Sequence, residues 1–180
     1  MISKFPAPIK GDYPEFTTSY INHAVASGEN IVKGLSESEK DFKKYILSLP
    51  EEVLNYRYAE GKWTVKDIVQ HLADTERILN YRLLRTLRRD TTPFSPFEEN
   101  DFVEAANASE RSIKDILKEF STVRKSSIEL VKTIARKDLK RIGRNKSGMI
   151  FTVNTLAHFI LGHPLHHLTI IKERYVSHEL

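Results

Sequence analysis

The sequence predicts an all-α protein, a four-helix bundle with long crossover connections. Apolar residues recur at helical spacing in four segments of the 180-residue chain. The connections 91–108 and 137–150 are each long enough to cross an end of such a bundle. No segment has the pattern of a strand ladder, although 149–151 could pair locally. The length suits a single domain, 1–180.

The first two long helical segments have start or stop signals in addition to their apolar stripes. Ser27 is the expected N-cap of the first helix, and Pro50 ends it. Thr64 and Asp67 form a start similar to a capping box for the second helix. The expected elements are an extended N-terminal arm over 1–14, a short helical stretch over 15–24, and long helices over 31–49, 64–89, 109–135 and from 152 onward.

Composition and charge exclude several classes of function. The chain has no cysteine, which excludes disulfides, thiolate zinc sites, iron–sulfur clusters and thiol nucleophiles. The net charge is +4, and the basic residues are dispersed among acidic ones, so nucleic acid is not the expected partner. No apolar run approaches the roughly 18 residues of a membrane span, and the first ten residues lack a secretory core. We therefore expect a cytoplasmic protein.

The densest basic cluster lies at the end of the second expected helix. It is interpreted as the solvated end of that helix, with phosphate binding as the alternative. The cluster consists of Arg82, Arg85, Arg88 and Arg89, and Asp90 follows it.

Histidine placement is the most informative feature of the sequence. Four of the seven histidines lie within residues 158–167, where composition predicts about 0.4. His163 and His167 are one helical turn apart on the apolar stripe of the last helix. His71 lies at the inner edge of the second helix. Three neutral imidazoles that converge from two helices would form a metal site with open positions for water or substrate.

The same histidines also fit a structural interpretation. His71 taken alone is better explained as a hydrogen-bonded core residue, and spacing alone favours neither interpretation of the three. His166 points about 100° away from His167, which suits a role beside the ligands rather than ligation. His158 is off the stripe and is expected to be structural. His23 and His178 have no evident partner.

Arg124 lies on the inner stripe of the third helix, where an unpaired cation would be costly. It is expected either to pair with an acid such as Glu76 or Asp101, or to bind an anionic group of a substrate. Pairing is the favoured interpretation. Trp63, immediately before the second helix, is expected to be a packing residue.

Two motifs resemble the signatures of the DinB/YfiT-like family. Residues 58–77, YAEGKWTVKDIVQHLADTER, are similar to the first signature, and residues 162–168, GHPLHHL, are similar to the second. The likeness covers roughly residues 50–176. It implies a four-helix bundle that holds a divalent metal ion through His71, His163 and His167.

The resemblance also implies a class of function. It indicates a metal-dependent enzyme, with zinc or nickel as the expected metal and a low-molecular-weight-thiol S-transferase as the leading activity. The alternatives are a metal-dependent hydrolase on the same site and a non-catalytic metal-binding or stress-responsive interaction protein. A small molecule is the expected substrate. No catalytic residue is assigned, and Arg124 and His166 are the candidates for contacting substrate or supporting the ligands.

Pro164 departs from the family pattern, in which an acidic or polar residue is more usual. Proline lacks the N–H that would bond to the carbonyl of Ile160, and it disfavours helical geometry at His163. The resulting kink either opens the metal site or spoils its geometry.

Two further expectations concern assembly and pH. A homodimer is expected from the resemblance and from Phe94, Phe97 and Phe102, which would leave apolar surface to bury. Metal affinity is expected to fall steeply from about pH 7 to 5, because protons compete with the ion near the ordinary histidine pKa of about 6.5.

Overall fold

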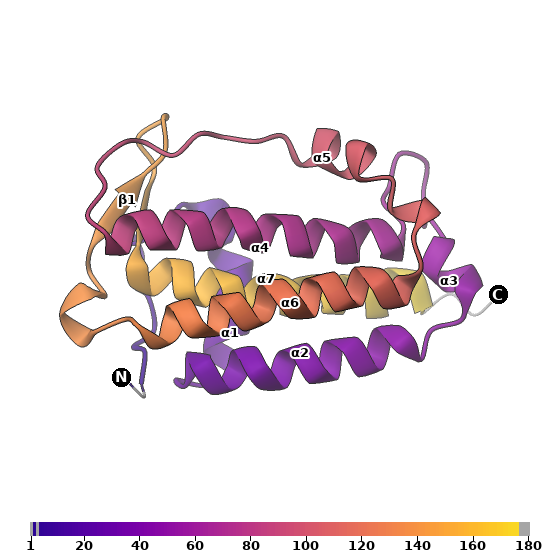
Figure 1. Cartoon of the computed structure of the whole chain (residues 1–180), viewed down its shortest axis with the longest axis horizontal. Coiled ribbons are helices and arrows are strands. Elements are labelled where there is room, and N and C mark those ends of the chain that lie inside the picture. The colour runs from indigo at the N-terminus through magenta and orange to yellow at the C-terminus, as the bar shows by residue number, and fades with distance from the viewer. Residues whose placement is uncertain (1, 3, 177–180) are drawn as a thin grey trace.

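The computed structural model describes residue 2 and residues 4–176, and its four long helices form a bundle (Figure 1). Helix α6 packs against both α2 and α4, and α7 also packs against both of them. This arrangement confirms the predicted fold class. The four helices are α2 (Ile31–Leu47), α4 (Val65–Leu87), α6 (Ile113–Lys132) and α7 (Val153–Ile171).

The connection between α4 and α6 is a crossover that spans the full length of the bundle. Helix α4 ends at the left of Figure 1, and the connection then runs back along the whole bundle before α6 begins at the right. Helices α4 and α6 therefore run in the same direction, although they are consecutive long helices and pack against each other. The predicted crossover over 91–108 is this segment.

The helix boundaries follow from capping residues. Thr64 and Asp67 form the predicted capping box, with Thr64 Oγ1 accepting from the Asp67 N–H at 3.0 Å and Asp67 Oδ2 accepting from the Thr64 N–H at 2.9 Å. Thr152 caps α7, which begins one residue after its predicted start at 152. The predicted cap Ser27 was wrong, because Asn30 caps α2 and Ser27 lies beyond the preceding helix.

One helix start and several short elements differ from the sequence prediction. The third long helix starts at Ile113, capped by Ser112, rather than at 109. The connections contain two short helices that were not predicted, because so few residues give no clear period. Residues 142–144 and 150–152 form an antiparallel pair, so the local pairing near 150 is real. The short elements are α1 (Thr18–Ala26), α3 (Glu51–Asn55), α5 (Glu99–Ala106), β1 (Ile142–Arg144) and β2 (Ile150–Thr152).

The N-terminal segment and the crossover both place aromatic side chains in the interior. The Phe5 side chain is buried, and its N–H donates to the carbonyl of Glu29 at 2.8 Å. Phe94 is buried as well, contrary to the expectation that it leaves apolar surface; its backbone bonds to Arg144. Phe102 remains 44% exposed. The homodimer stays a prediction, and Phe94 no longer argues for it, because its side chain is buried within the protomer.

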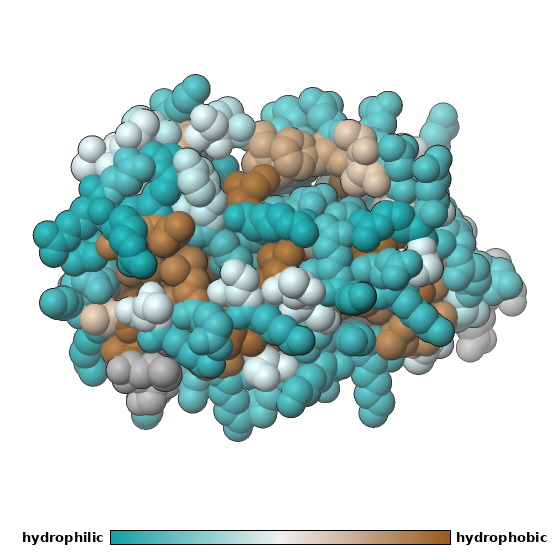
Figure 2. All heavy atoms as spheres, in the orientation of Figure 1, coloured by the Kyte–Doolittle hydropathy of each residue, from teal (hydrophilic) through white to brown (hydrophobic). Residues whose placement is uncertain are grey.

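Polar side chains dominate the face seen in Figure 2, and apolar ones show through mainly between the helices and along the connection from α4 to α5. Among the described residues, no helix combines the length and apolarity needed to cross a membrane.

Helix α1 crosses α7 at a backbone contact that only glycine permits. A Cβ atom added at Gly162 would lie 1.8 Å from the carbonyl oxygen of Tyr20. At Gly34, by contrast, the nearest atom to an added Cβ is the movable end of the Leu161 side chain, at 2.9 Å. The close approach at Gly162 fixes α1 directly beside His163.

We predict that Gly162→Ala destabilises the protein and that Gly34→Ala does not. Backbone cannot yield as a side chain can, so the first substitution should lower the free energy of unfolding by about 2 kcal/mol or more. The second should stay within about 1 kcal/mol of the wild type, because alanine also raises helix propensity. Urea unfolding followed by circular dichroism measures both, and equal midpoints for the two variants would contradict the role of the helix crossing.

Candidate metal centre

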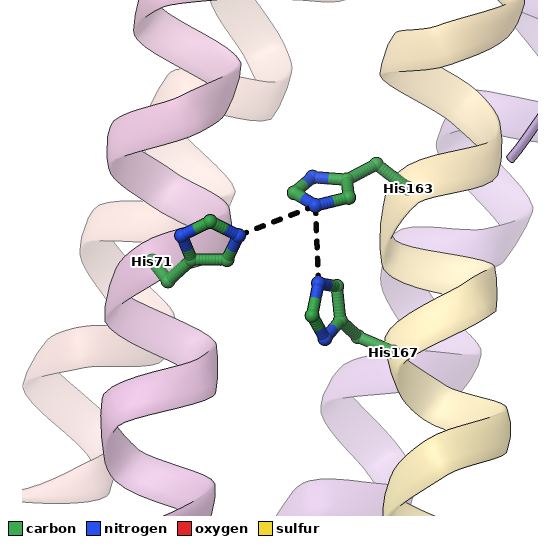
Figure 3. A group of neighbouring side chains, drawn as sticks. All are labelled: His71, His163 and His167. Atoms are coloured by element: carbon green, nitrogen blue, oxygen red, sulfur yellow. Dashed lines mark hydrogen bonds between the residues drawn. The ribbon is translucent and has the colours of Figure 1, made fainter. Parts of the chain in front are cut away.

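Three histidine side chains from two helices converge in the bundle interior (Figure 3). His71 comes from α4, and His163 and His167 come from successive turns of α7. The Nε2 atom of His163 lies 3.3 Å from Nε2 of His71 and 3.0 Å from Nε2 of His167. One ring nitrogen from each residue lies within 4.8 Å of the other two. The structure thus brings together the three residues that the sequence singled out.

The donor set fits a divalent metal ion. Two nitrogens bound to zinc at roughly 2.1 Å, with an angle between 90° and 109°, lie about 3.0–3.4 Å apart, which matches the two Nε2 distances. Lone pairs that face one another repel unless a proton or a cation lies between them. Thr75 Oγ1 is 3.3 Å from Nδ1 of His71, which fixes the orientation of that ring. Nδ1 of His167 is buried without a hydrogen-bond partner among the described residues.

Burial keeps the three imidazoles uncharged. Desolvation lowers the pKa of His71 to about 4. Desolvation also holds the pKa values of His163 and His167 well below the ordinary value, and the neighbouring histidine rings lower them further. The neutral form is the one that binds a metal ion. Protons are therefore expected to compete with a metal ion for these nitrogens at a lower pH than the predicted value near 6.5.

Pro164 does not break α7. Arg124 replaces the hydrogen bond that proline removes. The helix continues through Pro164 to Ile171. The carbonyl of Ile160, which proline leaves without its helical donor, accepts a hydrogen bond from Nη2 of Arg124 at 3.3 Å. Of the two outcomes left open for Pro164, the structure keeps the one-turn pairing of the α7 histidines.

Arg124 also forms a buried ion pair with Glu76. The side chains of Arg124 and Glu76 are 1% and 3% exposed, and Nη2 of Arg124 lies 2.7 Å from Oε2 of Glu76. The Ser127 hydroxyl donates to the other carboxylate oxygen. Arg124 therefore pairs with Glu76 rather than Asp101, and the pair joins α4 to α6 beside the histidines. Removing one partner of such a pair would leave an uncompensated charge in the core.

A cavity of about 260 Å³ opens beside the centre, bordered by His167 and Trp63. The indole ring of Trp63 lies 4.7 Å from the His71 ring, and its Nε1 donates to Oδ1 of Asn100 at 3.2 Å. Tyr175 forms another wall and donates its hydroxyl to the Trp63 carbonyl at 2.6 Å. Tyr58 and Lys62 complete the polar and aromatic lining. A small molecule in this cavity would contact His167 directly.

Comparison with known proteins places the chain in a family. The family model described as the DinB superfamily matches residues 34–171. The chain belongs to the DinB superfamily.

Two relatives of this DinB protein carry names that assign those relatives, by inference, to the metal-dependent hydrolases. One from Geobacillus thermodenitrificans is 26% identical over 111 residues, which is 62% of each chain. One from Oceanobacillus iheyensis is 22% identical over 87% of each chain. The match thus spans less than two thirds of the first relative and most of the second.

A solved structure has the same fold. The structure of YfiT from Bacillus subtilis, described as having an unusual four-helix bundle topology, superposes with a TM-score of 0.74. The two sequences are 22% identical, and the match covers 82% of this chain and 85% of YfiT. The likeness supports the parallel placement of α4 and α6.

The other described histidines of this DinB protein, His23, His158 and His166, lie outside the cluster. Nδ1 of His166 is 2.9 Å from the hydroxyl of Ser19, so His166 faces α1. His23, for which the sequence suggested no partner, packs its ring 5.6 Å from the His166 ring. His158 is buried and bonds to the carbonyl of Asn154, as expected of a structural residue. His178 lies outside the described residues.

Sequence reasoning missed several residues that border the centre. Trp63 was expected only to pack, yet it contacts a candidate ligand and lines the cavity. Its position directly before a capping box, one turn ahead of the buried face of α4, was the available signal. Tyr20 contacts His163 with a ring separation of 5.0 Å, and Thr75 orients His71; their positions depend on how the helices cross.

We predict that the metal-free protein loses stability as the pH falls from about 6.5 to 4. Over this range the unfolded chain binds a proton at His71 and the folded protein does not, so acid favours unfolding. The shift corresponds to about 3 kcal/mol for His71 alone. Urea unfolding at several pH values after chelation measures the slope. A His71→Gln variant should show a shallower slope, and an unchanged slope would contradict the burial of a neutral His71.

Proposed function

We propose that this protein is a divalent-metal-dependent enzyme that transfers a small thiol to an electrophilic substrate. The observation that supports the proposal is the convergence of three neutral imidazole nitrogens, one of them from His167, which lines a cavity of about 260 Å³. His71, His163 and His167 would hold the ion, zinc or nickel. When bound, the ion would supply Lewis acidity at the mouth of the cavity.

Residues of the chain would shape the cavity and exclude water from it. Trp63, Tyr58 and Tyr175 present aromatic surfaces that suit an apolar substrate body. Burial raises the pKa of Tyr175 to about 12, so its hydroxyl stays protonated and keeps donating to the Trp63 carbonyl. Lys62 adds positive charge at the rim, which favours an anionic nucleophile.

The nature of the cavity favours a thiol over water as the nucleophile. None of the described residues that line it is a carboxylate, so the cavity offers no acidic side chain as a general base. A thiol, with a pKa of about 8.5 when unperturbed, is partly ionised near neutral pH without a general base, whereas water, with a pKa of about 15.7, would depend wholly on a bound ion for activation. Arg124 is committed to Glu76 and is not proposed to contact substrate.

Metal-dependent hydrolysis is the second candidate function. The names given to the relatives from Geobacillus thermodenitrificans and Oceanobacillus iheyensis favour it. The same three histidines would serve both reactions.

We predict that nickel binding quenches the fluorescence of Trp63, the single tryptophan of the chain. Its ring lies 4.7 Å from that of His71, so an ion held there would be close enough to quench. His167→Ala should weaken nickel binding by more than about a hundredfold, since a direct ligand matters more than an outer partner. His166→Ala, a matched control one residue away that faces Ser19, should bind nickel like the wild type.

The same titration tests the corrected pH dependence. Because burial holds the ligands neutral to about pH 4 in the case of His71, nickel should still bind at pH 5. Added nickel should also raise the melting temperature at both pH 7 and pH 5. Equal loss of binding in the His166 and His167 variants would argue against the proposed ligands.

We predict that the metal-loaded protein accelerates the reaction of a small thiol, such as cysteine, with chlorodinitrobenzene. In that reaction a carbon–sulfur bond forms, the carbon–chlorine bond breaks, chloride leaves and the thiol proton passes to solvent. Chelation and His167→Ala should each abolish the acceleration. The absorbance of the thioether product measures the rate.

Nitrophenyl acetate without thiol provides the comparison. Metal-dependent release of nitrophenol from this ester, with no acceleration of the thiol reaction, would overturn thiol transfer in favour of hydrolysis. Metal binding with neither activity would favour the non-catalytic metal-binding alternative.

A further inference from the structure

A second cavity, of about 160 Å³, lies between α4 and the crossover that leads to α5. Phe97 from the crossover and Phe159 from α7 form apolar walls, and Phe16 stands at its edge with 62% of its surface exposed. Figure 2 shows apolar side chains along this crossover on the visible face. The proposed reaction does not use this cavity.

Arg82 is the cation of the second cavity, and it lacks an acidic partner. Among the described residues, no carboxylate forms an ion pair with it, whereas Arg85, one turn further along α4, pairs with Asp90 at 2.6 Å. Nη2 of Arg82 donates to the carbonyl of Ser95 at 3.2 Å, and Cζ lies 5.8 Å from the centre of the Phe97 ring. A guanidinium has five N–H donors, so most of its capacity is available to a ligand.

The second cavity reaches the metal centre through different residues from the first. Thr75 lines it, and the hydroxyl of Thr75 is 3.3 Å from Nδ1 of His71. Phe159 also lines it, and its ring is 5.7 Å from the His163 ring. A ligand in this cavity would therefore contact the residues that support the histidines.

We propose that the second cavity binds a small organic carboxylate, with the carboxylate on Arg82 and the apolar body between Phe97 and Phe159. A cavity of about 150 Å³ in another protein holds benzene, so the volume suits a ring-sized group. Arg–carboxylate pairs form two parallel hydrogen bonds, which gives the orientation. As a description of the substrate class, the inference rests on the proposed function; the binding itself does not require the metal ion.

A carboxylate fits this cavity better than a phosphate. Glu99 also lines the cavity, and burial raises the pKa of its carboxyl group, as does the nearby Glu98. A dianion would meet more repulsion from Glu99 than a monoanion. The ligand class is therefore a singly charged acid.

Benzoate and its neutral analogue benzamide form the test pair, titrated by calorimetry into protein freed of metal by chelation. Benzoate should bind about tenfold more tightly than benzamide, as expected for one charge-assisted pair that is half-exposed to solvent. Arg82→Gln should remove this difference. Phe97→Ala should weaken both ligands.

Two matched controls locate the binding. Arg88→Gln changes an exposed arginine at the C-cap of α4 and should leave benzoate binding unchanged. Lys62→Gln removes the cation of the first cavity and should also have no effect. Melting curves of each variant establish that it is folded, and Arg82→Lys, which keeps the charge without the planar fork, should retain part of the preference.

The outcomes separate clearly. Equal affinity for benzoate and benzamide, or equal loss in the Arg82 and Arg88 variants, would overturn the proposal. Loss in the Lys62 variant instead of the Arg82 variant would assign the ligand to the first cavity and also overturn it. Because the titration uses metal-free protein, a failure of nickel binding or of thiol transfer would leave its result intact.

Discussion

The ion pair between Glu76 and Arg124 is the interaction on which the geometry of the centre depends. It joins α4 to α6 in the core, and the same guanidinium nitrogen donates to the Ile160 carbonyl of α7. Pro164 creates the need for that donor, because it removes the N–H that would otherwise satisfy Ile160. Three helices are thereby joined close to His163, near enough for the Arg124 charge to add to burial in lowering the pKa of that histidine. A charged pair in the core is costly to desolvate, but leaving either partner alone would cost more.

The three histidine side chains are buried, and burial determines their protonation state. Desolvation, rather than a nearby cation, is the largest cause of their lowered pKa values. Neutral rings with ring nitrogens within 4.8 Å of one another form a donor set that suits a cation. The close crossing of α1 at Gly162 and the ring of Trp63 restrict access from two sides. The open side is the cavity bordered by His167.

The two cavities beside α4 hold different polar groups. The first has aromatic walls and a rim lysine and contacts a candidate ligand directly. The second holds Arg82 and contacts the centre only through Thr75 and Phe159. Arg82 and Arg85 belong to the same basic cluster in the sequence, yet Asp90 neutralises one and no described acid neutralises the other. The expected solvated helix end is thus an accurate description of part of the cluster only.

The sequence by itself predicted the bundle from helical periodicity, and it singled out the three candidate ligands from their spacing together with the resemblance to a family, because spacing alone favoured neither a metal site nor a structural role. Helical periodicity, the Thr64–Asp67 capping box and the one-turn spacing of His163 and His167 are local properties, and local hydrogen bonds and side-chain spacing suffice to set them. Tertiary structure decided what surrounds the ligands: the choice of Glu76 over Asp101 for Arg124, the rescue of the Ile160 carbonyl, the contact of Trp63 with His71, and the shift of the histidine pKa values. These depend on which helices pack together and how closely, and residues far apart in the chain carry no local signal of that packing.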